Sequence, residues 1–170
     1  FEANGSLLFH RQVTPLDIIL SRCVLEIVGA LVAGLVVSAI AMLLGYMDPP
    51  ADIGLIYLGL AYHAVFCLAC ALILAPVSEM SDVLEKFVAA FTYLMLPFSG
   101  AFAMVEWVPS KFQHLLMWSP SVHTSEIIRQ GQFGTSVHPH YDLMFLNWVC
   151  AAMILVGLSL TLRSRKNILV

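Results

Sequence analysis

Charged residues are scarce in this sequence. Eight Lys and Arg and 11 Asp and Glu make up 11% of its 170 residues, whereas 60% are hydrophobic. Soluble domains carry about 25% charged residues, so this chain has too few to cover a soluble surface. It also lacks the basic excess of nucleic-acid-binding proteins, because its formal net charge is −3. The composition excludes a soluble domain, a disordered chain and a nucleic-acid partner, and indicates a protein of the lipid bilayer.

The sequence is also poor in motifs that carry chemistry. The four cysteines, Cys23, Cys67, Cys70 and Cys150, lie in or beside apolar runs, and the C-x-x-C motif has no second pair of ligands. We therefore interpret them as ordinary helix residues. There is no H-E-x-x-H motif and no glycine-rich phosphate loop, so we expect no metal and no bound nucleotide in this chain. Because it begins at Phe1 without a leader, we expect it to be part of a longer protein.

Long apolar runs dominate what is present. They cover residues of about 23–47, 54–77, 87–105 and 142–162. A helix needs about 20 apolar residues to cross a bilayer, and none of these runs alternates with a period of two. The sequence therefore predicts an all-α integral membrane protein, with one domain over residues 1–170 and four transmembrane helices.

Short polar motifs predict where these helices begin and end. Residues 14–17 read Thr-Pro-Leu-Asp, which combines a hydroxyl N-cap with proline at the first helical position. Asp52 is placed to cap the second helix, and Asp82 with Glu85 resembles a capping box before the third. The Asp-Pro-Pro at 48–50 is expected to end the first helix.

Basic residues flank the apolar runs at the two ends of the chain. They are Arg11, Arg22, Arg163, Arg165 and Lys166. By the positive-inside rule both ends lie in the cytoplasm, which agrees with an even number of crossings. The loop around residues 48–52 and the long loop 106–142 then face the outside.

The long loop 106–142 has its own helical pattern. Residues 109–118 and 121–130 each carry apolar side chains at helical spacing, which predicts two short amphipathic helices at the outer membrane–water interface. Trp107 and Trp118 suit that depth, because tryptophan is enriched where lipid meets water.

One alternative from a different functional class is an intramembrane serine hydrolase. Ser99 with His63 or His123 has the residue types of a nucleophile and its base, but the sequence does not show that they meet. The segment 97–100, Pro-Phe-Ser-Gly, is more simply a kink or an end in the third helix.

Two other groups are candidates for a transport path. Phe91, Phe98 and Phe102 are spaced by seven and four, so a continuous helix presents them on one face. Such a stripe serves helix packing, or it offers flat surfaces on which sugar rings stack. Glu126 and Arg129 fit a solvated face, a local ion pair, or the lining of an exit.

Several longer segments resemble a known family. The opening ANGSLLFHRQVTPLDIILSRCVLE resembles the part of a type-2 ABC exporter permease that couples it to its ATPase. The segments LPFSGAFAMVEWVP and MWSPSVHTSEIIRQGQFG resemble the outer region of the same permeases, where two short periplasmic helices precede the final span. The resemblance is to the subgroup that exports capsular polysaccharide and O-antigen chains in Gram-negative bacteria. A type-2 exporter of lipids or drugs is the alternative within transport.

The resemblance implies a transport subunit and not an enzyme. It implies six spans per subunit, a homodimer of permeases in the bacterial inner membrane, a polysaccharide substrate, and two ATP-binding cassette subunits that bind ATP and Mg²⁺. This chain then has no cofactor of its own. A short cytoplasmic helix is expected to contact the ATPase. Its residues are Leu7, Leu8, Phe9, His10 and Arg11. The candidates for the translocation path or exit gate are Phe91, Phe98, Phe102, Trp107, Trp118, Glu126 and Arg129.

Overall fold

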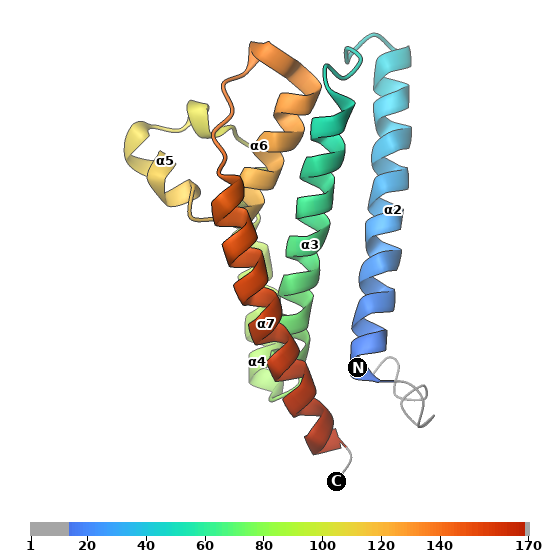
Figure 1. The fold of residues 1–170 in the computed structure, drawn as a ribbon, viewed down its shortest axis with the longest axis vertical. Coiled ribbons are helices and arrows are strands. Elements are labelled where there is room, and N and C mark those ends of the chain that lie inside the picture. Colours follow the sequence, from blue (N-terminus) through green and yellow to red (C-terminus); the bar gives the residue numbers. More distant parts are fainter. Residues whose placement is uncertain (1–13, 169–170) are drawn as a thin grey trace.

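The computed structural model describes residues 14–168, and that part of the chain contains helices and no strand (Figure 1). The α-helices are α2 (Pro15–Leu43), α3 (Ile53–Ser78), α4 (Asp82–Met95), α5 (Ser110–Leu116), α6 (Pro120–Phe133) and α7 (Leu143–Ile168). Three short 3-10 helices are η2 (Pro97–Ser99), η3 (Val105–Trp107) and η4 (Gly134–Ser136). The predicted all-α class is confirmed, and α5 and α6 lie within the long loop 106–142.

Three helices of the described part are long and apolar enough to cross a membrane. They are α2, α3 and α7. The predicted third span, 87–105, is not one continuous helix, because α4 ends at Met95. With 14 residues, α4 measures about 21 Å at 1.5 Å per residue, which is shorter than the hydrocarbon core. Four crossings therefore stay a prediction.

The end of α4 has a local cause. Pro97 lacks the N–H group that would continue the helical ladder, and the chain passes into η2. Gly100 then adopts φ +74°, a left-handed conformation that favours glycine. The segment 97–100 is thus a helix end, one of the two interpretations that its sequence allows.

The predicted N-caps are largely correct. Thr14 and Asp17 form a capping box at α2, and the Asp52 carboxylate accepts the N–H of Leu55 at 3.2 Å. At α4 the expected cap at Asp82 is wrong by one residue, since the N-cap is Ser81, whose hydroxyl accepts the N–H of Val83 at 3.3 Å.

The first helix ends before the Asp-Pro-Pro segment that was expected to stop it. α2 stops at Leu43, because Gly45 takes φ +74°. The N–H of Gly45 donates to the Met42 carbonyl at 3.0 Å, and that of Tyr46 donates to the Ala41 carbonyl at 2.9 Å. This pair of bonds is a Schellman motif, which satisfies carbonyls that the helix end leaves free.

α3 lies at the centre of the described residues. α7 runs parallel to it: the Tyr62 hydroxyl donates to the Asn147 side-chain carbonyl at 3.1 Å, and further along Thr161 donates to the Leu72 carbonyl at 3.2 Å. A Cβ atom added at Gly157 would lie 2.6 Å from the Cβ of Leu72, so only glycine permits this approach.

α6 runs antiparallel to α3 along its N-terminal half (Figure 1). Near the start of α3, the Asp52 N–H donates to the Gly131 carbonyl at 2.8 Å. Further along α3, His63 Nδ1 lies 2.9 Å from the Thr124 hydroxyl, near the start of α6. α4 lies beside the C-terminal half of α3 and, through η2, meets the start of α6. The shorter helices α6 and α4 thus pack against different halves of α3, α6 against its N-terminal half and α4 against its C-terminal half.

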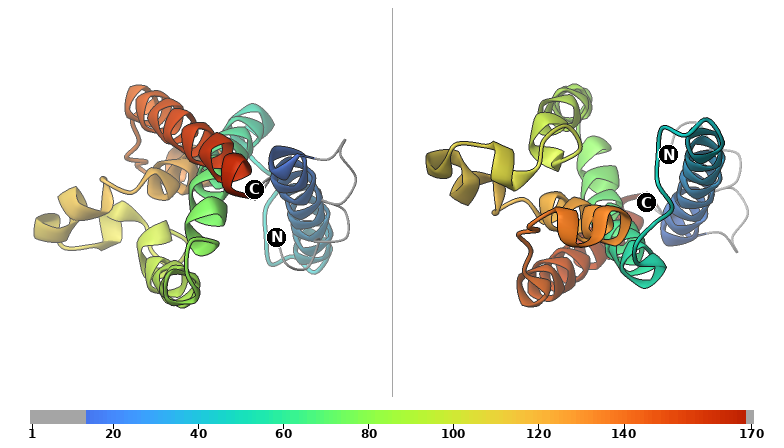
Figure 2. Two further views of the ribbon diagram at one scale, coloured as in Figure 1. Left: turned by 90° about the horizontal axis from the view of Figure 1, so that it is seen from below. Right: turned by 90° about the horizontal axis from the view of Figure 1, so that it is seen from above.

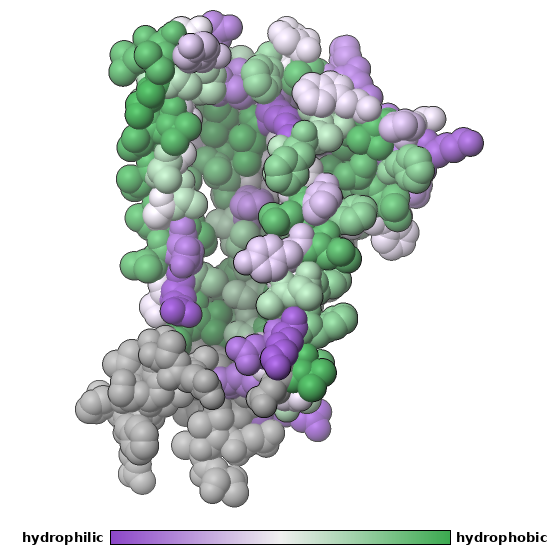
Figure 3. All heavy atoms as spheres, turned by 180° about the vertical axis from the view of Figure 1, so that it is seen from behind, coloured by the Kyte–Doolittle hydropathy of each residue, from purple (hydrophilic) through white to green (hydrophobic). Residues whose placement is uncertain are grey.

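α2 stands at the edge of this group, which is visible in both views of Figure 2. None of its most apolar stretch is buried. Seen from behind, apolar side chains cover most of the height of α2, and polar groups gather mainly towards its ends (Figure 3). Such a surface is suited to lipid or to other transmembrane helices.

Candidate functional site

The expected ATPase-coupling residues Leu7, Leu8, Phe9, His10 and Arg11 lie outside the described residues. The other candidates are described, and two of them, Glu126 and Arg129, lie on α6. This helix begins at Pro120, which is pre-shaped for the first helical position, and it ends at Phe133 before Gly134.

α6 does not lie on the surface as an amphipathic interfacial helix would. Half of its 14 residues are buried: Ser121, Val122, His123, Thr124, Glu126, Ile127 and Gly131. Close packing on α3 explains this, because Gly59 of α3 and Gly131 of α6 have no room for a side chain. A Cβ atom at Gly59 would lie 2.6 Å from Ile128, and one at Gly131 would lie 2.8 Å from the Asp52 carbonyl oxygen.

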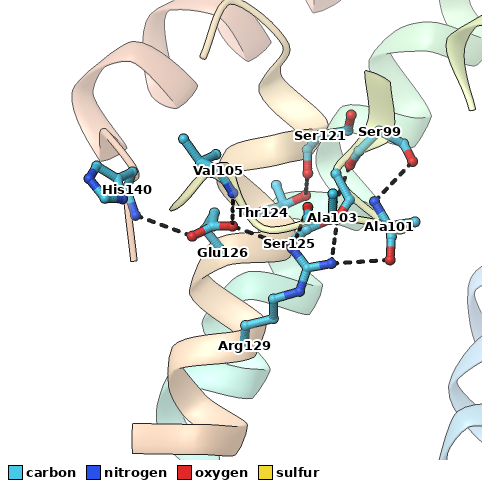
Figure 4. Close-up of polar contacts among 11 residues, drawn as sticks. Ser99, Ala101, Ala103, Val105, Ser121, Thr124, Ser125, Glu126, Arg129 and His140 are labelled. Atoms are coloured by element: carbon cyan, nitrogen blue, oxygen red, sulfur yellow. Dashed lines mark hydrogen bonds and ion pairs between the residues drawn. The ribbon is translucent and has the colours of Figure 1, made fainter. Parts of the chain in front are cut away.

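Arg129 points at the segment that joins η2 to η3 (Figure 4). Its guanidinium donates to the carbonyls of Gly100 at 2.5 Å, of Ala101 at 3.1 Å and of Ala103 at 3.1 Å. Only 18% of its side chain is exposed. The planar guanidinium has five N–H donors, so one side chain can hold several carbonyls that no helix satisfies.

Glu126 lies one turn before Arg129 and is fully buried. One carboxylate oxygen accepts the Val105 N–H at 3.2 Å and pairs with the Arg129 guanidinium at 3.3 Å; the other accepts the His140 N–H at 3.3 Å (Figure 4). Because a buried carboxylate is stable only when paired and hydrogen-bonded, this geometry excludes the solvated face and supports the local ion pair.

A third side chain of α6 is His123, which was grouped with Glu126 and Arg129 on this stretch, but whose contact with the start of α7 the sequence did not indicate. Its Nδ1 accepts the Asp142 N–H at 2.9 Å, so Nε2 carries the proton and donates to the Met117 carbonyl at 2.8 Å. The ring also contacts Phe145 at 5.0 Å between centroids. His123 thus ties α6 to the start of α7. Its partners lie 6 to 22 residues away in the sequence, so no short sequence motif indicates these contacts.

The aromatic candidates are not brought onto one helix face. Phe91 lies on α4 and stacks on Phe87 with centroids 6.3 Å apart, but Phe98 lies in η2 and Phe102 follows the left-handed Gly100. The spacing argument assumed a continuous helix, and α4 ends too early for it. Phe102 is 75% exposed, Trp107 is 71% exposed and Trp118 is 70% exposed. Their place in a transport path stays a prediction.

The serine hydrolase alternative finds no dyad in residues 14–168. The Ser99 hydroxyl donates to the Leu96 carbonyl at 2.7 Å and accepts the Ala101 N–H, so it serves the helix end. His63 Nδ1 lies 2.9 Å from the Thr124 hydroxyl, which itself donates to the Ser121 carbonyl. No hydrogen bond in this part of the chain joins Ser99 to His63 or His123.

The cysteines behave as ordinary helix residues. Cys23, Cys67, Cys70 and Cys150 are free thiols on α2, α3 and α7. Within the described ranges no three His, Cys, Asp or Glu side chains gather as a metal site.

The sequence is similar to those of several known proteins. The chain is 36% identical over 166 residues to the capsule polysaccharide export inner-membrane protein BexB of Haemophilus influenzae, covering 98% of this chain and 63% of that protein. It is 33% identical, with the same coverage, to the capsule polysaccharide export inner-membrane protein CtrC of Neisseria meningitidis serogroup A. Nodulation protein J of Rhizobium meliloti is 29% identical over 94% of this chain.

The chain spans 63% of the length of the capsule relatives named here. The model of the family described as ABC-2 type transporter matches residues 6–133, which include α2, α3, α4, α5 and α6. The chain therefore belongs to the ABC-2 type transporter family.

Proposed function

We propose that this chain is part of the membrane permease subunit of an ATP-driven exporter that moves capsular or related polysaccharide outward across the bacterial inner membrane. The observation that carries the proposal is the 36% identity, over 98% of the chain, to a protein named for capsule polysaccharide export in the inner membrane. The three apolar helices of the described part agree with a membrane location.

In this proposal the chain crosses the membrane four times, with both of its ends in the cytoplasm. The crossings are α2, α3, α4 continued by η2, and α7. Two permease subunits form the channel, and two ATP-binding cassette subunits bind ATP and Mg²⁺ and hydrolyse the nucleotide. This chain supplies the path and binds no cofactor itself.

The outer helices α5 and α6 form the mouth of the channel in each subunit. Apolar side chains suit a closed mouth, because they exclude water and ions. The exposed rings of Phe91, Phe98, Phe102, Trp107 and Trp118 are the candidates for surfaces along which sugars stack.

Deletion of the encoding gene tests the function. We expect loss of polysaccharide from the cell surface and its accumulation inside the cell, with both restored by the wild-type gene. Quantification of polysaccharide in whole and lysed cells measures this. Unchanged surface polysaccharide with an altered lipid or drug efflux would support the other type-2 exporters.

Energy coupling is tested at the segment Leu7–Arg11. Phe9→Asp places a carboxylate where we expect an apolar contact with the ATPase, and an unpaired buried charge costs several kcal/mol. Co-purification of the ATPase subunit should therefore fall strongly. Phe112→Asp on α5 is the matched control, because it adds the same charge at a side chain that is 58% exposed. Equal association of both variants would remove residues 7–11 from the coupling role.

A further inference from the structure

The two charged side chains of α6 bind backbone groups of two separate segments. Arg129 binds the carbonyls of Gly100, Ala101 and Ala103, and Glu126 binds the N–H groups of Val105 and His140. We call Glu126, Arg129 and these five backbone groups the 126/129 clamp (Figure 4). It joins α6 to the end of η2 on one side and to the loop before α7 on the other.

Further contacts reinforce both junctions. The Ser125 hydroxyl donates to the Ser99 carbonyl at 3.2 Å, and a Cβ atom at Gly100 would lie only 3.1 Å from the Val122 Cα. On the other side, the Asp142 N–H donates to His123. Displacing η2 from α6 would thus strip several partners from a buried ion pair, which is costly.

The neighbouring helix α5 is attached to α6 at its C-cap, where His123 donates to the Met117 carbonyl at 2.8 Å, but no charged side chain of α6 binds it. None of its residues is buried, and Phe112 and Leu115 are 58% and 61% exposed. The outer pair of helices therefore has two different parts: α6, held by charged hydrogen bonds, and α5, which packs loosely. Regions with few buried contacts are the ones that move at low cost.

We propose that Glu126 and Arg129 are positioning residues of transport, which make α4 with η2, α6 and the start of α7 move as one unit. This inference rests on the proposed exporter function. A displacement of α4 then carries α6 with it, and the mouth opens at α5 without any separation of α6 from η2. Neither charge needs to touch the sugar.

Substitution of Arg129 gives the first test, made on the full complex with its ATPase. Arg129→Ala should lower polysaccharide export about tenfold or more, because several charged hydrogen bonds are lost together. Insertion, assembly and ATP hydrolysis should remain. Arg129→Lys should recover part of the export, since an ammonium group still donates to some of these carbonyls. Lys111→Ala on α5 is the matched control, because it removes a cation that is exposed, and it should export normally.

A covalent replacement of the clamp gives the decisive test. In a protein whose four native cysteines are replaced, Ser99→Cys and Ser125→Cys are joined by oxidation or by a short bifunctional thiol reagent, and mass spectrometry confirms the link. With Arg129 intact, the linked protein should export as well as the reduced one, because the two segments never part. With Arg129→Ala, the link should restore export, and reduction should abolish it again.

The structure also predicts the outcome of charge reversal. Glu126→Arg combined with Arg129→Glu should stay inactive, since a carboxylate at position 129 would face carbonyls and a guanidinium at position 126 would face N–H groups. Recovery of export by this double variant would show that the charges act only on each other.

Besides recovery by the double charge reversal, three results would overturn the proposal. The first is normal export by Arg129→Ala, and the second is a block of export by the link when Arg129 is intact. The third is failure of the link to restore export in Arg129→Ala. This third result would favour a direct contact of Arg129 with the sugar. Failure of the proposed function is distinguished by the wild type, which in that case would export no polysaccharide at all.

Discussion

Gly131 determines how closely α6 approaches the start of α3. A Cβ atom there would lie 2.6 Å from the Ile56 side chain and 2.8 Å from both the Asp52 carbonyl oxygen and the Ile56 nitrogen. Backbone atoms cannot turn away as a flexible side chain can, so the helices themselves would have to separate. The Asp52–Gly131 hydrogen bond of 2.8 Å would be stretched by that movement.

Gly131→Ala is therefore expected to destabilise the protein by about 1–3 kcal/mol, the usual cost of overpacking. Thermal denaturation of the detergent-purified protein measures it. Gly29→Ala on α2 is the matched control, because nothing lies within 4 Å of the added methyl group. Alanine has a higher helix propensity than glycine, so the control should be neutral or slightly stabilising. Equal melting temperatures for the two variants would contradict the tight α3–α6 contact.

The end of α4 depends on Gly100 for two reasons that can be separated. Its φ of +74° disfavours any other residue, and an added Cβ atom would also lie 3.1 Å from the Val122 Cα. Gly45 at the end of α2 shares the same φ of +74° but has nothing within 4 Å. Substitution of Gly45 therefore tests backbone strain alone, whereas substitution of Gly100 tests backbone strain together with a steric clash against α6.

Gly45→Ala is expected to cost about 1–2 kcal/mol, the penalty of the left-handed conformation. Gly100→Ala should cost more and should also lower export, because the added methyl group pushes the end of η2 away from α6 and disturbs the 126/129 clamp. Thermal denaturation and export of the two variants are compared with wild type. If Gly100→Ala were no worse than Gly45→Ala, the contact between η2 and α6 would not limit stability.

The helices themselves could be predicted because their signals are local. Apolar runs, the Thr14 and Asp52 caps and the breaks at Pro97 and Gly100 are all visible in a few consecutive residues. The early end of α2 was missed because Gly45 was not weighed as a cap, although it lies before the Asp-Pro-Pro segment.

The burial of Glu126 could not be predicted in the same way. Its partners Val105 and His140 lie 21 and 14 residues away and contribute only backbone N–H groups. Any residue type supplies such groups, so no pattern of side chains marks them. The neighbouring Arg129 was visible as an ion-pair partner at i+3, and that part of the interpretation is confirmed.

The arrangement of residues 14–168 places the loop after α2 and the loop before α7 at the same end. α3 and α7 run parallel, so their first residues lie towards the same end. The Gln132 side chain donates to the Asp48 carbonyl at 2.8 Å, which ties the loop after α2 to the end of α6. Met80, in the turn between α3 and α4, lies at the opposite end and is 73% exposed.

Cysteine labelling with a membrane-impermeant maleimide tests this arrangement together with the proposed orientation. Asp48→Cys and His138→Cys, in a protein without native cysteines, should be labelled in intact cells once the outer membrane is permeabilised. Met80→Cys should be labelled only in inverted vesicles. The proposed direction rests on the basic residues near the ends of the chain, because positively charged loops tend to stay in the cytoplasm. Labelling of Met80→Cys alone in intact cells would reverse the orientation.

If Asp48→Cys and His138→Cys were labelled from opposite sides, the parallel packing of α3 and α7 would itself be contradicted, since the contacts between them leave both loops at one end.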